Sequence, residues 1–586
     1  MLLQRLAEYA ERLDLPPPLY TESPVRYLIS LDRSGRLLDP EPIDTADPKD
    51  RVRRRGELHA VPQVQRTVAV KPLLFADNAE YTLGLAREKS RSERVKACHA
   101  AYVELVDRCA AATCEPAVEA VSAFLHSDPL RQLRLPKDFD PGATITFRVD
   151  GQYVVDLLAV QAFWASINDP AAMPDQPAPV MQCVVCGQER PVLRRLQGKL
   201  KGVPGGQTSG TALISANAEA FVSYGLEESL IAPTCAACGE RFTKAANVLL
   251  ADQRQRLTIG NAAFIFWTRE ASPISLSELF TKPSTEHVRA LLDAVRTGKL
   301  PPDVETNAFY ATALSGSGGR AVVRDWIDTT LGEALRHVAT WFQRQRIVGP
   351  VGEEPEPLSL YSLAAATVRD ARRDLPTTTP RALWRGALLG TPLSISLLYE
   401  AVRRNRAEQR VTRPRAALIK LVLLSQQPEV EEEVMVRLEP SNPNPAYQCG
   451  RLLAVLEEVQ RAAIPGVKAT LVDRFYGTAS TAPLTVFPRL LRGAQPHLAK
   501  LERDRPPAYR AFQRRLEEIL ANIVGFPPIL PLADQGQFAL GYYHQRAHDR
   551  AQALAAREQY LRGEQRVAEE LPLEAVEPET PTEEEE

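Results

Sequence analysis

Two cysteine pairs frame the stretch that decides how this chain is organised: Cys183-Val-Val-Cys186 and Cys235-Ala-Ala-Cys238. Two cysteines separated by two residues can place both thiolates on one tetrahedral ion, and a second pair completes a four-sulfur shell for zinc. The gap between the pairs is longer than in a zinc ribbon, so we expect a folded insert whose ends meet. Four thiolates leave no open position for water, which predicts a structural site. Redox or merely buried cysteines are the alternative.

A glycine- and hydroxyl-rich run, Gly205-Gly-Gln-Thr-Ser-Gly210, follows a basic stretch within the insert. Glycines allow close approach of the backbone to a ligand, and amides and hydroxyls can donate to phosphate. The run lacks the Gly-x-x-x-x-Gly-Lys-Ser/Thr order of a nucleoside-triphosphate loop. A surface loop without a ligand is an equally open alternative. The residues predicted to face a polyanion are Arg194, Arg195, Lys199, Lys201, Gly205, Gly206, Gln207, Thr208 and Ser209.

Composition indicates an ordinary soluble protein of several domains. Hydrophobic residues make up 44% of the 586 residues and charged residues 25%, enough to bury several cores. The net charge of -2 means that any nucleic-acid binding must come from local basic patches, such as the run of arginines over 403–415. No apolar stretch approaches the roughly 20 residues of a membrane span, and the N-terminus is not a secretory signal. We therefore expect a cytoplasmic protein.

The order of patterns along the chain predicts an α+β fold. Two β-hairpins are expected, one around Asp32-Arg-Ser-Gly35 and one at Asp150-Gly151, because Asp-Gly favours a tight turn. A strand over 68–75 and a buried strand over 262–267 are expected as well. Strand signals fade after Ser284, with the run over 321–327 left ambiguous, and the clearest helix stops at Pro465-Gly466. Cys98 and Cys109 share one helical stripe, which is typical of a core.

Motifs across nearly the whole chain, taken together, resemble those of one family. They are Gly-Gly-Gln-Thr-Ser-Gly with Ser215-x-Asn217, Ala220-Phe221-x-Ser223-Tyr224-Gly225 and Asn247-x-Leu249-Leu250; Asp77-Asn78-x-x-Tyr81-x-Leu83-Gly84; Ile259-Gly260; Gly450-Arg451-Leu452 with Leu456-Glu457-x-x-Gln460; Val486-Phe487-Pro488; and the run from Gln535 to Arg546. The sequence is thereby similar to the large subunit of the type I-C CRISPR Cascade complex, the Csd or Dvulg family. The zinc prediction rests on this sequence alone.

The resemblance implies a PAM-reading role for the N-terminal region. The PAM is the short duplex motif beside the target, and the residues indicated are Lys71, Asn78 and Tyr81. Asparagine can pair bidentately with adenine and lysine with guanine. From the residues alone, an Asp-Asn pair is more often a turn or a helix cap.

The resemblance also implies partners and a division into regions. The partners are guide RNA, target double-stranded DNA and its displaced strand, other Cascade subunits, a helicase-nuclease, and a small subunit made by internal translation, for which Met435 is a candidate start. The predicted regions are a mixed N-terminal domain (1–170), a central region with the zinc-pinned insert (171–350), a helical C-terminal domain (351–570) and an acidic disordered tail (571–586).

No spacing of the eight histidines matches a metal nuclease or hydrolase, and no pair of carboxylates stands out. We therefore expect a non-enzyme. The implied function is to read the PAM, promote R-loop formation and recruit the helicase-nuclease. The alternative is a stand-alone, zinc-stabilised nucleic-acid-binding or regulatory protein. A zinc-dependent hydrolase is a third reading, which a closed four-thiolate shell disfavours.

Overall fold

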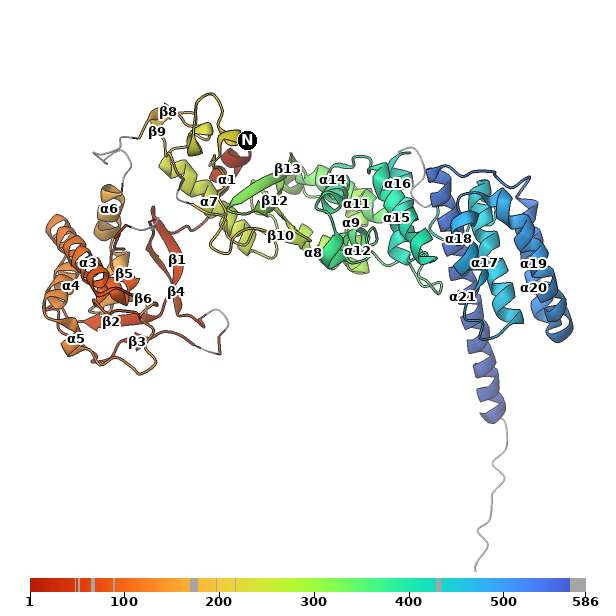
Figure 1. Cartoon of the computed structure of the whole chain (residues 1–586), viewed down its shortest axis with the longest axis horizontal. Coiled ribbons are helices and arrows are strands. Elements are labelled where there is room, and N and C mark those ends of the chain that lie inside the picture. The colour runs from red at the N-terminus through yellow and green to blue at the C-terminus, as the bar shows by residue number, and fades with distance from the viewer. Residues whose placement is uncertain are drawn as a thin grey trace, which may run out of the picture. The chain divides into compact units, whose positions relative to one another are not determined.

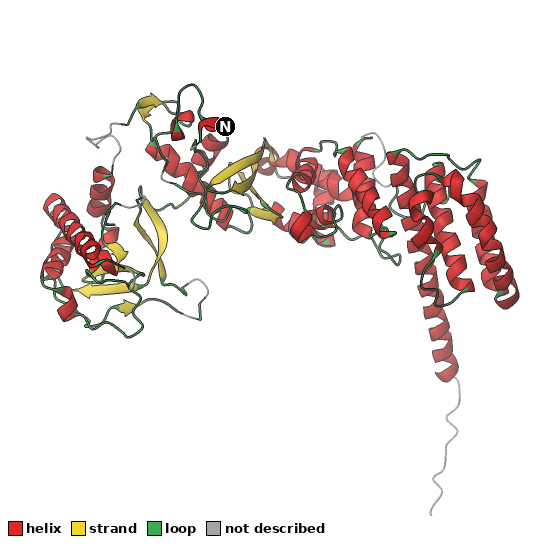
Figure 2. Cartoon of the chain, in the orientation of Figure 1, coloured by secondary structure: helices red, strands yellow, loops and turns green. Residues whose placement is uncertain are grey.

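The chain folds into two compact units. The computed structural model describes residues 1–47, 49–50, 53–64, 69–87, 90–168, 178–196, 198–216, 218–427 and 434–569. The first unit comprises Met1–Ala251 and Gly316–Val322, and the second comprises Asp252–Ser315 and Val323–Glu586 (Figure 1). Strands and helices mix in the first unit and helices dominate toward the C-terminus, which confirms the α+β class (Figure 2).

The predicted acidic tail over 571–586 lies outside the described residues. The predicted division at residues 170, 350 and 570 stays a prediction.

A five-stranded sheet forms the centre of the first unit, with the order β3-β2-β6-β5 and with β7 paired to β6. Strands β2 and β6 run parallel, and the other neighbours run antiparallel. All five residues of β2 are buried, which explains its continuous apolar run. The strands are β2 (Tyr27–Leu31), β3 (Ile43–Asp44), β5 (Ala76–Asn78), β6 (Thr144–Val149) and β7 (Gln152–Tyr153), and a separate antiparallel pair joins β1 (Tyr20–Val25) to β4 (Glu57–Pro62).

The two predicted hairpin turns are present in the first unit. Asp32 donates its N–H to the carbonyl of Arg36, and Leu31 bridges to Leu37. At the second turn Asp150 and Gly151 both have positive φ, 50° and 85°, the pattern that matches strand twist in a two-residue hairpin.

The predicted strand over 68–75 is wrong for its described part, 69–75. This part forms no strand, and β5 begins only at Ala76. Pro72 lacks a ladder N–H, and Phe75 adopts a left-handed φ of 57°, which an extended strand does not allow.

The first unit also contains helices, and those over 79–82, 92–113, 116–126 and 158–167 contribute buried residues to the core that includes the sheet. Cys98 and Cys109 are buried on α3, as predicted. The helices are α1 (Leu2–Ala10), α2 (Ala79–Thr82), α3 (Ser92–Thr113), α4 (Pro116–His126), α5 (Pro129–Gln132), α6 (Leu158–Ile167) and α7 (Ala236–Ala251), with 3-10 turns η1 (Val154–Asp156), η3 (Glu219–Phe221) and η4 (Glu228–Ile231).

A four-stranded sheet with the order β10-β11-β12-β13 begins the second unit. It contains β10 (Arg256–Ile259), β11 (Ala262–Thr268), β12 (Ala308–Ser317) and β13 (Arg320–Thr330). The buried strand expected over 262–267 is confirmed. The expectation that strand signals fade after Ser284 is wrong for β12, and the ambiguous run over 321–327 lies in β13. Strand β12 lies between two neighbours with seven consecutive buried residues, so it shows no apolar-polar alternation that would predict a strand.

Helices make up the rest of the second unit. They are α8 (Leu276–Thr281), α9 (Thr285–Arg296), α10 (Pro302–Thr306), α11 (Leu331–Arg344), α12 (Leu360–Ala365), α13 (Ala371–Asp374), α14 (Thr378–Leu389), α15 (Ile395–Glu408), α16 (Arg413–Ser425), α17 (Pro445–Ala463), α18 (Leu471–Ala479), α19 (Pro483–Asp504), α20 (Pro506–Ala521) and α21 (Leu532–Glu569). Among the described helices none is long and apolar enough to span a bilayer.

Helix α17 packs against α19, α20 and α21 (Figure 1). Its contact with α21 is made through glycines on both helices. A Cβ on Gly450 would lie 2.0 Å from the carbonyl oxygen of Phe538, and a Cβ on Gly541 would lie 2.1 Å from that of Tyr447. The two backbones therefore approach as closely as only glycine permits.

Candidate functional site

The four paired cysteines come together in the first unit. Each pair comes from a different element: Cys183 and Cys186 lie on the turn between β8 (Val180–Gln182) and β9 (Glu189–Pro191), whereas Cys235 and Cys238 lie at the start of α7. The four Sγ atoms lie within 4.8 Å of one another. Backbone bonds hold the two segments together, since the N–H of Val184 donates to the carbonyl of Pro233 over 2.9 Å. The ends of the insert thus meet, as its length required.

Burial and local donors set the protonation of these thiols. Cys183 is buried, which acts to raise its pKa, but backbone N–H groups of Cys186, Cys235 and Val185 outweigh burial and lower its pKa to about 7. Burial raises the pKa of Cys235 and of Cys238, and the charge of Cys183 raises both further. Four sulfurs packed this closely cannot all ionise unless a cation compensates them.

This donor set fits zinc. An ideal tetrahedron with Zn–S bonds of ~2.3 Å separates its sulfurs by about 3.8 Å, which small side-chain movements can reach from the observed spacing. Zinc would be held by all four thiolates and would pin the base of the insert. Within the described part of the chain, these cysteines form the one group of three or more metal-ligating side chains.

The glycine-rich loop is packed against the tip of the β12–β13 hairpin, which belongs to the same unit. Gly316 donates its N–H to the carbonyl of Pro204 over 2.7 Å, and Gly206 bridges to Gly318. A Cβ on Gly316 would lie 2.1 Å from the backbone nitrogen of Gly206. The close approach made by Gly205 and Gly206 is therefore to the chain's own hairpin.

The distal half of the loop faces outward. The side chains of Gln207, Thr208 and Ser209 are exposed. Neither Thr208 nor Ser209 makes a hydrogen bond to any other described residue. Their amides and hydroxyls can therefore donate to an anion.

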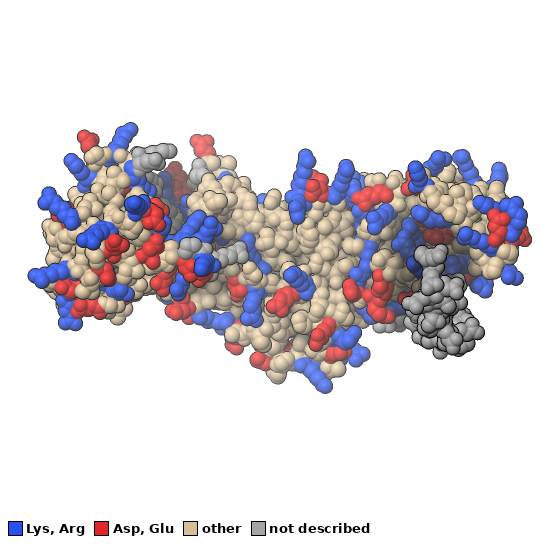
Figure 3. All heavy atoms as spheres, turned by 90° about the horizontal axis from the view of Figure 1, so that it is seen from below, with Lys and Arg blue, Asp and Glu red and all other residues tan. Residues whose placement is uncertain are grey.

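Basic side chains of the insert differ in how far they are neutralised. Arg195 pairs with Glu228 at 2.6 Å. Arg194, Lys199 and Lys201 are exposed and form no ion pair with any other described residue. Elsewhere, basic and acidic groups are interspersed on the face drawn in Figure 3. These three cations therefore give the insert a local positive charge that the net charge of -2 conceals.

Three of the predicted residues, Lys199, Lys201 and Ser209, line a cavity of about 650 Å³ in the first unit. Helix α7 forms one wall, where Asn247 accepts the N–H of Lys201 at 2.8 Å and donates to the carbonyl of Lys199 at 2.9 Å. These two bonds fix the backbone that carries both lysines. Sequence reasoning named Asn247 only as part of the motif Asn247-x-Leu249-Leu250 and assigned it no role of its own.

The proposed PAM-reading residues lie in different environments. Asn78 caps α2, where its Oδ1 accepts the N–H of Glu80 at 3.0 Å, and no described residue accepts a hydrogen bond from its Nδ2. Tyr81 is buried, and Lys71 is exposed. The structure thus confirms that Asn78 is a helix cap and leaves one of its donors available.

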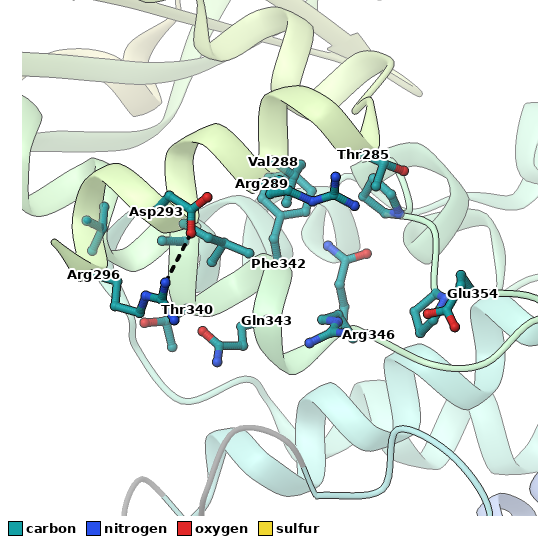
Figure 4. A pocket seen from close by; sticks show the side chains of 16 residues that line it. Thr285, Val288, Arg289, Asp293, Arg296, Thr340, Phe342, Gln343, Arg346 and Glu354 are labelled. Carbon is teal, nitrogen blue, oxygen red and sulfur yellow. Dashed lines mark ion pairs between the residues drawn. The ribbon is translucent and has the colours of Figure 1, made fainter.

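A second cavity, of about 720 Å³, lies in the second unit between α9, α11 and the segment after it. Figure 4 shows Arg289, Arg296 and Arg346 around it with two acids, and Asp293 pairs with Arg296 at 3.6 Å. Arginines and acids alternate around this cavity, so its residues do not favour an anion as clearly as those of the insert do.

The run of arginines over 403–415 is partly internal. Arg404 and Arg415 are buried and both pair with Glu408. Arg403 pairs with Glu400. The run therefore offers less free charge than its sequence suggests.

A family model described as CRISPR-associated protein (Cas_Csd1) matches residues 3–549. The chain belongs to this family. It is accordingly a CRISPR-associated Cascade subunit. No curated protein matches the chain.

Several motifs of this Cas_Csd1 chain that sequence reasoning singled out lie in the core of the second unit. Glu457 on α17 is buried and accepts hydrogen bonds from Tyr542 of α21 and from Arg461. Arg451 bonds to Gln545 at 2.9 Å. These residues stabilise the α17–α21 contact, whereas the cysteine cluster and the glycine-rich loop form the candidate site.

Proposed function

We propose that this protein is the large subunit of a type I-C RNA-guided surveillance complex, which reads the PAM in duplex DNA, promotes R-loop formation and recruits the helicase-nuclease. The observation that carries the proposal is the family match over residues 3–549. Guide RNA, target DNA with its displaced strand, the other Cascade subunits and an internally translated small subunit are the proposed partners. Base pairing with the guide supplies sequence specificity, and the protein reads a few base pairs and backbone charge.

The insert supports binding of a nucleic-acid backbone. Lys199 and Lys201 project from a backbone that Asn247 fixes, beside the donors of Thr208 and Ser209. Cations held at fixed positions next to free amides suit successive phosphates. Zinc on the four cysteines holds the base of this insert, so its role is structural.

Asn78 supports PAM reading in a restricted form. Because its Oδ1 accepts the N–H of Glu80, Nδ2 is the atom available to donate a hydrogen bond to an acceptor on a base edge. Bidentate pairing with adenine would also require Oδ1, which already accepts the N–H of Glu80, to accept a second hydrogen bond. Buried Tyr81 acts by positioning α2, and exposed Lys71 supplies charge.

We propose further that the subunit is not an enzyme. Two of the described histidines bond to backbone carbonyls: His99 to that of Tyr81, and His337 to that of Leu388. A closed four-thiolate shell offers no position for an activated water.

The decisive experiment measures binding of guide-matched duplexes by the co-expressed complex, with and without this chain, across a randomised PAM library. Selective enrichment only with the chain present supports the proposal. Equal enrichment without it would contradict PAM reading.

Variants of Asn78 separate base contact from helix capping. Asn78→Asp keeps an oxygen acceptor for the N–H of Glu80 and removes the Nδ2 donor, whereas Asn78→Ala removes both. A base contact predicts that both variants alter PAM preference. If only Asn78→Ala does so, the residue acts through the cap.

A further inference from the structure

The turn that carries Tyr224 holds this residue in a backbone conformation that tyrosine disfavours. Leu226 donates its N–H to the carbonyl of Ser223 over 2.9 Å, and the two residues between them, Tyr224 and Gly225, have φ of 53° and 71°. Positive φ at both central positions is the pattern of a type I′ turn, which favours Asn or Gly at the first position. A tyrosine there adopts a left-handed backbone that its Cβ disfavours.

The side chain of Tyr224 makes no interaction in the described chain that would offset this backbone strain. Tyr224 is 98% exposed, and its side chain makes no hydrogen bond or ring contact with any other described residue. Backbone strain at an exposed residue that makes no such interaction within the described chain suggests a role outside the fold.

The surroundings connect this turn to the glycine-rich loop. The guanidinium of Arg320 lies 3.8 Å from the ring centroid of Phe221, which is itself 41% exposed. Arg320 sits on the hairpin tip that also supports the loop, since Ala212 donates to the carbonyl of Gly319 and Gly206 bridges to Gly318. The same hairpin tip therefore supports both the glycine-rich loop, with the donors of Thr208 and Ser209, and the segment that carries the rings of Phe221 and Tyr224.

We propose that Tyr224 is a stacking platform for an unpaired nucleobase of the strand whose backbone follows the glycine-rich loop, an inference that rests on the proposed function of that loop. Aromatic rings beside a basic groove are how proteins hold single strands without reading sequence. Exposed Glu219 and Glu227 flank the turn, so its tip offers the ring and not a positive charge. A single protruding ring suits the uncharged face of one base and is too small for a protein interface.

Photocrosslinking of the full-length chain tests this contact. Oligonucleotides carrying 5-iodouracil, as single-stranded DNA, as single-stranded RNA and as duplex DNA, are irradiated with the protein, and the attached residue is mapped by mass spectrometry. We expect attachment at Tyr224 with one or both single strands and much less with duplex. The DNA and RNA arms identify which strand is bound.

Three variants distinguish a ligand contact from a structural role. Tyr224→Asn should retain or raise the midpoint of thermal unfolding, because Asn suits the turn, while weakening single-strand binding by roughly 5- to 150-fold, the range for one stacked base. Tyr224→Phe should bind like the native chain. Tyr361→Asn removes another exposed tyrosine, from α12, and should change neither property.

Two results would overturn the inference: crosslinks that avoid residues 218–226, or single-strand affinity unchanged in Tyr224→Asn. Loss of association with other subunits, with unchanged strand affinity, would assign the ring to a protein contact instead. PAM selection by the complex is measured in a separate experiment, so failure of this contact is distinguishable from failure of the proposed function.

Discussion

Replacing Gly316 by alanine should detach the glycine-rich loop from its support. The new Cβ would lie 2.1 Å from the nitrogen and 2.4 Å from the Cα of Gly206, and both are backbone atoms that cannot rotate away. The loop must retreat by roughly 1 Å, and overpacking of this kind costs about 1–3 kcal/mol. The bond from Gly316 to the carbonyl of Pro204 would also be lost, adding about 1 kcal/mol.

Hydrogen exchange at the base of the loop measures this cost. Leu200 and Thr211 exchange backbone hydrogen bonds at 2.8 Å, so their amides report opening of the loop. A cost of about 2–4 kcal/mol speeds their exchange by roughly 30- to 700-fold. If the opening free energy of the native loop is smaller than this cost, exchange rises only to the rate of an unprotected amide.

Gly319→Ala provides the matched control in the same hairpin. A Cβ there would meet only the flexible side chain of Gln207, at 3.5 Å or beyond. Its exchange should stay close to that of the native chain. Equal exchange in the two variants would refute the idea that Gly316 is kept as glycine so that the loop can rest on it.

Three further perturbations should behave as follows. Metal analysis should find one zinc per native chain, and a native chain without metal contradicts the zinc assignment. Cys183→Ser should lose the metal and several kcal/mol of unfolding free energy, whereas Cys114→Ser, outside the cluster, should change neither. Gly450→Ala should destabilise the second unit by about 1–3 kcal/mol in urea, whereas Gly493→Ala, with nothing near its Cβ, should stabilise it by up to about 1 kcal/mol; equal effects would contradict the close-approach argument. Burial, assisted by the charge of Lys420, lowers the pKa of His544 to about 3, and an unfolded histidine titrates near 6.5, so protons favour the unfolded chain as pH falls between these values. Unfolding free energy should therefore fall by about 2 kcal/mol more from pH 7 to pH 5 in the native chain than in His544→Gln, and equal slopes would show that His544 does not titrate this way.

Features fixed by local chemistry could be predicted from the sequence. The Asp150-Gly151 turn needs positive φ at two positions, and few residue pairs provide it. The spacing of the paired cysteines predicted that their four sulfurs come together, whatever residues lie between the pairs. Helix α17 carries its stop signal just beyond its last residue, so its end was predictable.

Features that depend on distant partners could not be predicted. Strand β12 is buried on both faces and therefore lacks alternation. The charge on Arg415 is cancelled by Glu408, which lies on the preceding helix. The glycine-rich loop resembles a ligand cradle, yet Gly206 approaches Gly316 of a hairpin far along the chain. In each case the partner is supplied by the tertiary fold, so no local pattern records it.

A motif residue that stabilises the folded chain has a structural explanation, whereas one that destabilises the folded chain suggests a functional role. Gly450 and Glu457 are residues whose replacement would break a close contact or leave buried partners unsatisfied, so folding alone accounts for them. Tyr224 is the reverse case, because asparagine would suit its turn better and its ring contacts no other described residue. A residue that the fold would be more stable without must contribute through something the fold does not contain. By this criterion we propose the exposed face of the insert, and not the helical core, as the surface that binds the ligand.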